Sequence, residues 1–318
     1  MLIWIIDDEW PGYELEKRVI YERYPDCDLR FSNNDYKDDL LSFGKKADAV
    51  ICQISVDMSA DTIEKLENCK VISVYGVGYN NVDIECARKK GIRVCNVPGY
   101  CAEDVSDYVI AAIYEKCKLW KKYDSDDGLW GAQAAPHEIF RISSQTLFIV
   151  GFGRIGRMIA KKALAVGMKV LVYDPYVDED TTAALGVEKV LLDDGLSRAD
   201  FVSMNMIMCD ETRHMISTNE LKLMKNTAYI INASRGGTLD QRALIEAVEN
   251  KEIAGAVLDV LEQEPPSPDD PILSCKNIEI TPHISFYSED SLNELQVSAA
   301  MNALSILDGK DISEIVNR

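Results

Sequence analysis

The sequence is poor in the residues that build metal centres and disulfide frameworks. Its 318 residues include three histidines, and its nine cysteines form no Cys-x-x-Cys pair and have no histidine at metal-ligand spacing. An odd number of scattered thiols is typical of a protein kept in a reducing compartment and argues against a disulfide-bonded secreted domain. We therefore predict no metal site and a cytoplasmic location.

Long apolar runs and positive charge are also scarce. The first apolar run, at 2–6, is followed at once by three acidic residues and is too short for a signal peptide or a membrane span. The formal net charge of −19 disfavours nucleic acid and membrane surfaces as partners. The chain has no repeats or low-complexity tracts, and its length allows two domains with cores of their own.

Short apolar runs alternate with helical patterns, which indicates an α/β fold. The polar segment 121–136 is expected to be an exposed loop or arm. Strands are expected at 2–6, 49–54, 71–74, 92–95, 146–150, 169–173, 201–204, 228–232, 255–258 and 278–281, and helices at 62–66, 84–90, 105–120, 157–166 and 288–307.

The most informative motif is a glycine-rich turn between the run at 146–150 and a helical pattern. It contains Gly151, Gly153 and Gly156. In a dinucleotide-binding turn, the first glycine allows a tight bend and the second lets the backbone approach a pyrophosphate. The third lets the helix pack closely on the strand. This order of strand, glycine turn and helix predicts a dinucleotide site.

The residues around this turn favour NAD as the cofactor. The amides of Arg154 and Ile155 are expected at the positive end of a helix dipole, where a diphosphate binds well. The next strand ends in Asp174, which can accept hydrogen bonds from the adenosine ribose. No Arg or Lys follows Asp174 before Lys189, so nothing nearby suits the 2′-phosphate of NADP.

Three later strand ends carry residues that suit ketone reduction, because a doubly wound sheet binds its ligands at the carboxyl ends of its strands. Arg235 can hold a substrate carboxylate through its planar fork. His283 can give a proton to a carbonyl oxygen and take it back. A carboxylate would orient the imidazole and favour its protonated form; Glu264 is the preferred candidate and Glu262 the competing one.

On these motifs, and on the segments 75–83 and 91–98, the chain resembles the D-isomer-specific 2-hydroxyacid dehydrogenase family nearly end to end. The resemblance implies that Arg235, Glu264 and His283 are the catalytic residues. It also implies that the amides near Val77 and Gly78 bind the substrate carboxylate. Asp259 and the backbone near Ala233 would then hold the nicotinamide carboxamide.

The resemblance also implies an architecture of two doubly wound domains. A Rossmann NAD-binding domain at 100–287 would be inserted into a flavodoxin-like substrate-binding domain formed by 1–99 and 288–318. A homodimer formed through the region 100–145 is expected. The substrate pocket is expected to include Tyr75 and Phe286, and an aromatic wall without basic residues favours a medium apolar or aromatic keto acid over a phosphorylated one.

The chain departs from the family pattern in places. Asn80 or Asn81 stands where an Asp is usual, and 205–207 lacks the usual His-x-Pro. The segment 283–288 is closest to the C-terminal-binding-protein corepressors. The predicted function is reversible reduction of a 2-keto acid to a D-2-hydroxy acid with NADH. The alternative is an NAD(H)-sensing, corepressor-like binding protein with weak or no turnover.

The other two histidines are given no catalytic role. His214 lies in a polar stretch and is interpreted as a surface residue. His137 lies in the predicted arm, from which it could reach the site of a neighbouring subunit. An alanine-dehydrogenase-like enzyme is a third possibility, but it would not explain the three catalytic motifs in this order.

Overall fold

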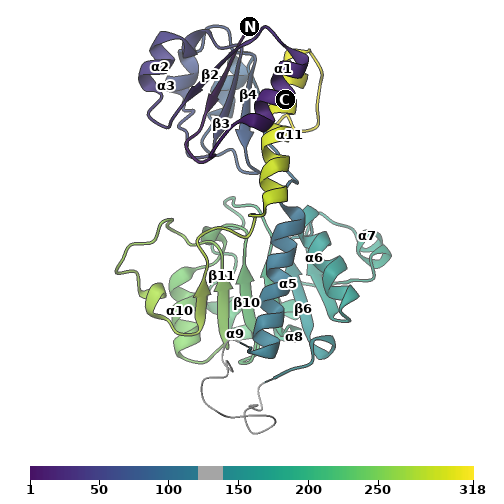
Figure 1. Cartoon of the computed structure of the whole chain (residues 1–318). Helices are drawn as coiled ribbons and strands as arrows, with labels where there is room; N and C mark the ends of the chain where they lie inside the picture. The colour runs from purple at the N-terminus through teal and green to yellow at the C-terminus, as the bar shows by residue number, and fades with distance from the viewer. Residues whose placement is uncertain (121–138) are drawn as a thin grey trace. The chain divides into compact units, whose positions relative to one another are not determined.

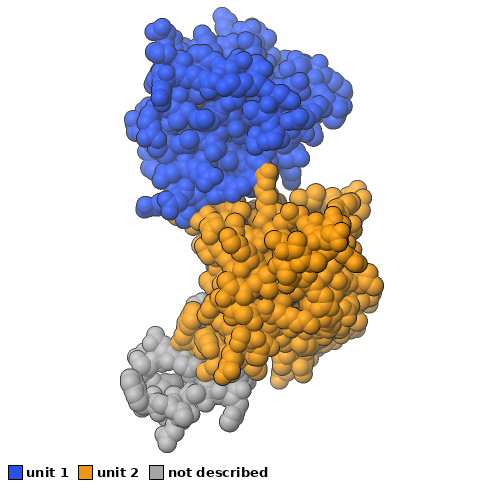
Figure 2. Space-filling view, turned by 90° about the vertical axis from the view of Figure 1, so that its right-hand side faces the viewer, with its two compact units in different colours: residues 1–100, 288–318 blue, residues 101–287 orange. Residues whose placement is uncertain are grey.

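The structure is a computed structural model and describes residues 1–120 and 139–318. The chain divides into two compact units (Figure 2). The first comprises Met1–Tyr100 and Ser288–Arg318, and the second comprises Cys101–Tyr287. The second unit is therefore an insertion in the chain of the first. His137 and the whole of the predicted arm lie outside the described residues.

The first unit is built on a five-stranded parallel sheet whose strand order is β2-β1-β3-β4-β5. This is the flavodoxin-like order, the kind of domain that the family resemblance implies for these residues. Its central strands are buried, as expected for a sheet covered on both faces. The strands are β1 (Leu2–Ile6), β2 (Asp28–Ser32), β3 (Ala49–Gln53), β4 (Val71–Tyr75) and β5 (Arg93–Cys95).

Helices cover both faces of this sheet (Figure 1). The last helix of the chain, α11 (Glu289–Leu307), packs on β3 and β4, where the Ser73 hydroxyl donates a 2.8 Å hydrogen bond to the Ala299 carbonyl oxygen. The predicted return of the C-terminal helix to the first domain is thus observed. The other helices are α1 (Glu14–Arg23), α2 (Lys37–Ser42), α3 (Ala60–Glu64) and α4 (Ile84–Lys89).

The second unit contains a seven-stranded parallel sheet whose strand order is β12-β11-β10-β9-β6-β7-β8. The order reverses between β6 and β9, which is the Rossmann arrangement with one further strand, so ligands are expected beside the carboxyl ends of these strands. The strands are β6 (Thr146–Val150), β7 (Lys169–Tyr173), β8 (Glu188–Lys189), β9 (Phe201–Met204), β10 (Tyr229–Asn232), β11 (Gly255–Leu258) and β12 (Ile278–Ile280).

Helices also cover both faces of the second sheet, with α5 packed against α6 (Figure 1). The second unit contains α5 (Ala102–Lys118), α6 (Arg154–Ala165), α7 (Glu179–Ala184), α8 (Leu192–Arg198), α9 (Thr218–Leu223) and α10 (Gln241–Glu249), with a 3₁₀ turn at Gly236–Thr238. No helix in the described ranges has both the length and the apolar character that a membrane span requires. The predicted fold, two doubly wound α/β domains, is confirmed.

The close packing of the backbone around Gly156 gives the first test of this fold. An added Cβ at Gly156 would lie 2.3 Å from the Gly151 carbonyl oxygen, whereas one at Gly153 would meet no atom within 4 Å. We expect Gly156→Ala to lower the free energy of unfolding by about 1–3 kcal/mol, the usual cost of overpacking. Urea unfolding measures this change.

Two other alanine variants serve as controls. Gly153→Ala should leave stability unchanged but weaken NADH binding, because its methyl group would fill the space left for a pyrophosphate. Gly12→Ala, which also meets no atom within 4 Å, should change neither property. Unaltered stability in Gly156→Ala would contradict the packing argument.

Candidate active site

The glycine turn has the three features that its sequence predicts. Gly151 adopts a φ of +93°, and a Cβ there would lie 2.7 Å from the backbone oxygen of Asn205. Gly153 precedes α6 as its N-cap and faces open space. Gly156 allows α6 to pack against the end of β6, so each glycine meets a different steric demand.

The residues around this turn fit a dinucleotide. Gly153, the N-cap of α6, has no side chain that could cover the first turn of this helix. That turn begins with Arg154 and Ile155. Asp174 follows β7 and is half-buried. Its carboxylate accepts 2.8 Å hydrogen bonds from the amides of Phe152 and Tyr176. Asp174 therefore also holds the glycine turn in place, a role that the motif alone did not reveal.

His283 and Glu264 form a close pair at the carboxyl ends of β11 and β12. The Nδ1 atom of His283 lies 2.7 Å from Oε2 of Glu264, and the two side chains are 38% and 37% exposed. Since Nδ1 is engaged, Nε2 is the nitrogen left to exchange a proton with another molecule. The pairing predicted from sequence, with Glu264 rather than Glu262, is the one observed.

The pKa of Glu264 is lowered by this environment. Burial acts most strongly and would raise the pKa, but the hydrogen bonds from His283 and from the Leu261 amide, at 2.8 Å, act in the opposite direction. The positive charges of His283 and Arg235 lower the pKa further. Glu264 is therefore held as a carboxylate near neutral pH, with Arg235 close enough to act on it electrostatically.

Arg235 lies in a turn after β10 that is shaped by a buried amide. The Asn232 side chain accepts hydrogen bonds from the amide and hydroxyl of Ser234 and donates to the Arg235 carbonyl oxygen at 3.1 Å. The guanidinium donates to the Ser234 carbonyl oxygen at 2.7 Å. Ala233 lies half-buried in the same turn. The sequence motifs assign no function to Asn232.

Asp259 is a structural anchor for the loop that carries His283. Its side chain is 1% exposed. The carboxylate accepts hydrogen bonds from the Thr281 hydroxyl at 2.6 Å and from the amides of Ile284 and Ser285 at 2.8 Å each. The resemblance implied only a contact with the nicotinamide carboxamide, whereas the structure shows that this residue fixes the chain on both sides of His283.

Two predicted substrate contacts lie in a loop of the first unit. Within the described part of the chain, the amides of Val77 and Gly78 have no hydrogen-bond acceptor. The loop is held by Asn96, whose side chain donates to the Val77 carbonyl oxygen at 2.7 Å, and by Asn81, which donates to the carbonyl oxygens of Gln53 and Val56. The loop thus presents two free donors on a fixed backbone.

Tyr75 requires a correction. Its side chain, predicted to line the substrate pocket, is 2% exposed, and its hydroxyl donates to Glu16 at 2.9 Å within the first unit. Because Tyr75 ends a strand buried on both faces, its side chain supports the core beneath the loop at 76–81. Phe286, by contrast, is only half-buried and contacts the His283 ring edge-on, with 6.2 Å between ring centroids.

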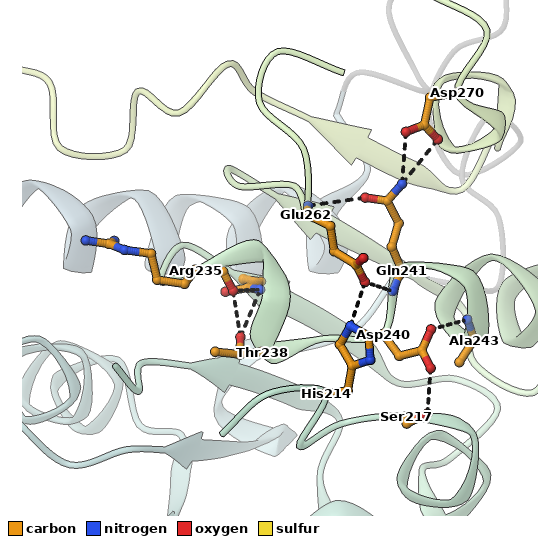
Figure 3. A network of polar contacts seen from close by, with 10 residues as sticks. His214, Ser217, Arg235, Thr238, Asp240, Gln241, Ala243, Glu262 and Asp270 are labelled. Atoms are coloured by element: carbon orange, nitrogen blue, oxygen red, sulfur yellow. Dashed lines mark hydrogen bonds and ion pairs between the residues drawn. The ribbon is translucent and has the colours of Figure 1, made fainter. Parts of the chain in front are cut away.

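A second His–Glu pair lies beside the site (Figure 3). His214 Nε2 is 3.0 Å from Glu262 Oε1, which also accepts from the Gln241 amide. These two residues and Asp240 bring potential metal-ligating atoms within 4.8 Å of one another. Their atoms already bind one another or nearby protein groups, so the cluster is explained as a tie between loops. Figure 3 shows the Arg235 side chain extending away from it.

The lowered pKa of Glu264 predicts a pH-dependent stability difference between the native protein and Glu264→Gln. A carboxylate with a depressed pKa stabilises the fold above its unfolded-state pKa, and this contribution is lost as the pH falls through the folded-state pKa. We expect the native protein to be the more stable near neutral pH and the difference to shrink on acidification. Urea unfolding across this range measures it.

The exposed Glu246, which pairs with Arg242 one helical turn away, provides the control variant Glu246→Gln. A Glu264→Gln effect that grows in acid would contradict the assigned shift. An effect that Glu246→Gln reproduces would show that it arises from the loss of any surface charge.

Comparison with known proteins gives consistent results. Residues 110–285 match the family model described as the NAD-binding domain of D-isomer specific 2-hydroxyacid dehydrogenases. The chain is 34% identical over 306 residues to a glyoxylate reductase from Korarchaeum cryptofilum, covering 95% of this chain and 86% of that protein.

Solved structures agree along the whole chain. The TT0316 protein from Thermus thermophilus superposes with a TM-score of 0.85 at 30% identity, covering 99% of this chain and all of that one. A D-lactate dehydrogenase from Aquifex aeolicus, solved with NAD and lactic acid, superposes with a TM-score of 0.82 at 26% identity, covering all of this chain and 99% of that one.

Proposed function

Because the chain belongs to the D-isomer-specific 2-hydroxyacid dehydrogenase family, as its motifs predict, we propose that it interconverts a small 2-keto acid and its D-2-hydroxy acid with NAD(H). The prediction of NAD as the cofactor is confirmed by the NAD-binding family model. The subgroup likeness to the corepressors remains a prediction. The substrate and the residue roles given below are our proposal.

The observation that carries the proposal is the His283–Glu264 pair at 2.7 Å, with Arg235 close enough to lower the pKa of Glu264. An imidazole held by a carboxylate beside a guanidinium is the arrangement that reduction of a keto acid needs. One group supplies the proton, and the other binds the substrate carboxylate. A purely NAD-sensing protein would not require this arrangement.

In the proposed reduction, bound NADH supplies the hydride that reaches the carbonyl carbon. His283 gives its Nε2 proton to the carbonyl oxygen, so that one hydride and one proton convert the ketone to the hydroxyl. Glu264 stabilises the protonated imidazole before this step and keeps its ring oriented. In the direction of oxidation, neutral His283 takes the hydroxyl proton.

Substrate orientation is assigned to donors that bind a carboxylate. Arg235 offers a planar fork for two parallel hydrogen bonds to a carboxylate. In the first unit, the free amides of Val77 and Gly78 are donors suited to the same kind of group. Phe286 is assigned to the substrate side chain. Tyr75 is assigned to the support of the loop and not to substrate contact.

The cofactor is assigned to the second unit. Gly151, Gly153 and Gly156, with the amides of Arg154 and Ile155, would hold the pyrophosphate. Asp174 would accept from the ribose. Ala233, through its backbone, and Asp259 would lie beside the nicotinamide carboxamide. We also propose that the protein is a cytoplasmic homodimer that binds neither nucleic acid nor membranes.

The substrate class is tested by following NADH oxidation with glyoxylate, hydroxypyruvate, pyruvate, 2-ketoisocaproate, phenylpyruvate and 3-phosphohydroxypyruvate, each repeated with NADPH. We expect an apolar or aromatic keto acid to have the highest kcat/KM, with NADH preferred. A higher value for 3-phosphohydroxypyruvate would overturn the pocket assignment. Tight NADH binding without turnover of any compound would instead favour the NAD(H)-sensing alternative.

A further inference from the structure

A chain of hydrogen bonds joins helix α5 to the loop that carries His283. Tyr108 Oη lies 2.7 Å from Thr281 Oγ1, and Thr281 Oγ1 lies 2.6 Å from Asp259 Oδ1. The Asp259 carboxylate also accepts from the amides of Ile284 and Ser285. The Tyr108 hydroxyl is thus linked through Thr281 to the Asp259 carboxylate, which holds the chain on both sides of His283.

The direction of these hydrogen bonds follows from the number of protons. Thr281 has one hydroxyl proton, which it donates to the Asp259 carboxylate, so Tyr108 must be the donor to Thr281. Burial, aided by the charges of Asp259 and Glu279, raises the pKa of Tyr108 to about 12. Its hydroxyl therefore keeps its proton throughout the usual assay range.

The loop needs such support because its backbone is strained. His283 has a φ of +54°, in the left-handed region that residues other than glycine rarely adopt. A residue stays in this region only where surrounding contacts determine its conformation. Here the His283 amide donates to the carbonyl oxygens of Thr281, in the same loop, and of Asp259, whose carboxylate anchors that loop.

Helix α5 is itself fixed along β12. Lys116, eight residues after Tyr108 and on the same face of the helix, forms an ion pair with Glu279. Glu279 and Thr281 are two residues apart, so their side chains lie on the same side of β12 and of the residue that follows it. The contacts that Lys116 and Tyr108 make with them follow that side. The Lys116 side chain is almost fully buried. Tyr108 therefore presents its hydroxyl from a firmly held helix.

We propose that Tyr108 and Thr281 are positioning residues for His283. The Tyr108 hydroxyl fixes the Thr281 hydroxyl, which anchors Asp259 and so holds the imidazole at its hydrogen-bonding distance from Glu264. The inference rests on the proposed function, because it assigns these residues to the geometry of the proton donor. Neither residue touches the reacting atoms.

The test compares Tyr108→Phe and Thr281→Val with two matched variants. Thr281→Ser keeps the hydroxyl and should restore function. Tyr114→Phe removes a hydroxyl from the same helix but breaks no hydrogen bond within the described structure. Each purified full-length variant is assayed for kcat, KM, NADH affinity and thermal stability across pH. Since the chain has only three histidines, the signals of the His283 imidazole can also be followed by NMR.

We expect Tyr108→Phe and Thr281→Val to lower kcat on the order of tenfold, because small displacements of a catalytic group reduce rates steeply. NADH affinity should change less than kcat, because the residues assigned to the pyrophosphate and the ribose follow other strands, β6 and β7. A looser contact with Glu264 leaves the imidazole less well oriented, so the loss should appear in kcat rather than in KM. The NMR signals of the His283 imidazole should differ from those of the native protein. Thr281→Ser and Tyr114→Phe should behave like the native protein.

Three results would overturn the inference. These are a kcat of Tyr108→Phe equal to that of Tyr114→Phe, unchanged NMR signals of the His283 imidazole, and a Thr281→Ser variant as impaired as Thr281→Val. Failure of the proposed function has a different signature. In that case His283→Gln would itself retain native activity, whatever Tyr108→Phe does.

Discussion

Replacing His283 with glutamine is expected to lower kcat for keto-acid reduction by about 10²–10⁴-fold, the range that a general acid contributes. Glutamine can still form a hydrogen bond with Glu264, but it cannot supply a proton to the carbonyl oxygen. NADH affinity and thermal stability should stay close to native, because the side chain is 38% exposed. Steady-state kinetics and NADH fluorescence titration measure these quantities.

The protein contains a closely matched control for this variant. His214 also pairs with a glutamate, Glu262, at 3.0 Å, and is 41% exposed. It also has a positive φ, +48° against +54° for His283. His214→Gln therefore removes a similar His–Glu pair from the same unit and should leave kcat unchanged. Equal losses in the two variants would show that the effect is structural.

Replacing Arg235 with glutamine is expected to lower kcat/KM by about 10²–10⁴-fold. A hydrogen bond to a charged group contributes about 1.5–3 kcal/mol, and a guanidinium fork can make two such bonds to one carboxylate. Arg235→Lys should recover only part of the loss, because an ammonium group lacks the planar fork. Kinetics with the best substrate of the keto-acid panel measure the effect.

Arg242, a highly exposed arginine on α10 of the same unit, provides the control. Arg242→Gln should leave kcat/KM unchanged, since its partner is Glu246 on the surface of its own helix. If Arg235→Gln retained native kcat/KM toward every keto acid that the protein reduces, the assignment of the substrate carboxylate would be wrong.

The central strands were predictable because they are buried on both faces and carry uninterrupted apolar runs. The bounds predicted for 146–150, 169–173, 201–204 and 255–258 are those observed. Strand β2 was missed because it lies at the edge of its sheet and has only two apolar residues, Leu29 and Phe31, which alternate with polar ones. Short helices such as α8 and α9 have too few turns to show a clear apolar period.

Helix ends were less predictable than helix positions. The helix after the glycine turn was expected at 157–166 but begins at Arg154, because the turn itself supplies the N-cap at Gly153. Helix α5 was expected at 105–120 and spans Ala102–Lys118, with Leu119 in a left-handed conformation at its end. Such boundaries depend on cap geometry that an apolar pattern does not contain.

The candidate site was predictable as far as the strand-end rule extends. That rule selected Arg235, His283 and the segment after β11, in which Glu264 was the preferred candidate and Glu262, two residues away, the competing one. Tertiary contacts pair Glu264 with His283 and Glu262 with His214. The anchoring bonds of Asp259 and Tyr108 join residues far apart in sequence, so no local pattern signals them.

The most direct test of the proposed function is the stereochemistry of the product. The purified protein is given NADH and the best keto acid of the panel, and the hydroxy acid is identified by chiral chromatography while NADH consumption is followed. We predict one D-2-hydroxy acid formed for each NADH oxidised, and no product from His283→Gln on the same timescale. An L-hydroxy acid, or NADH binding without any hydroxy acid, would contradict the proposal.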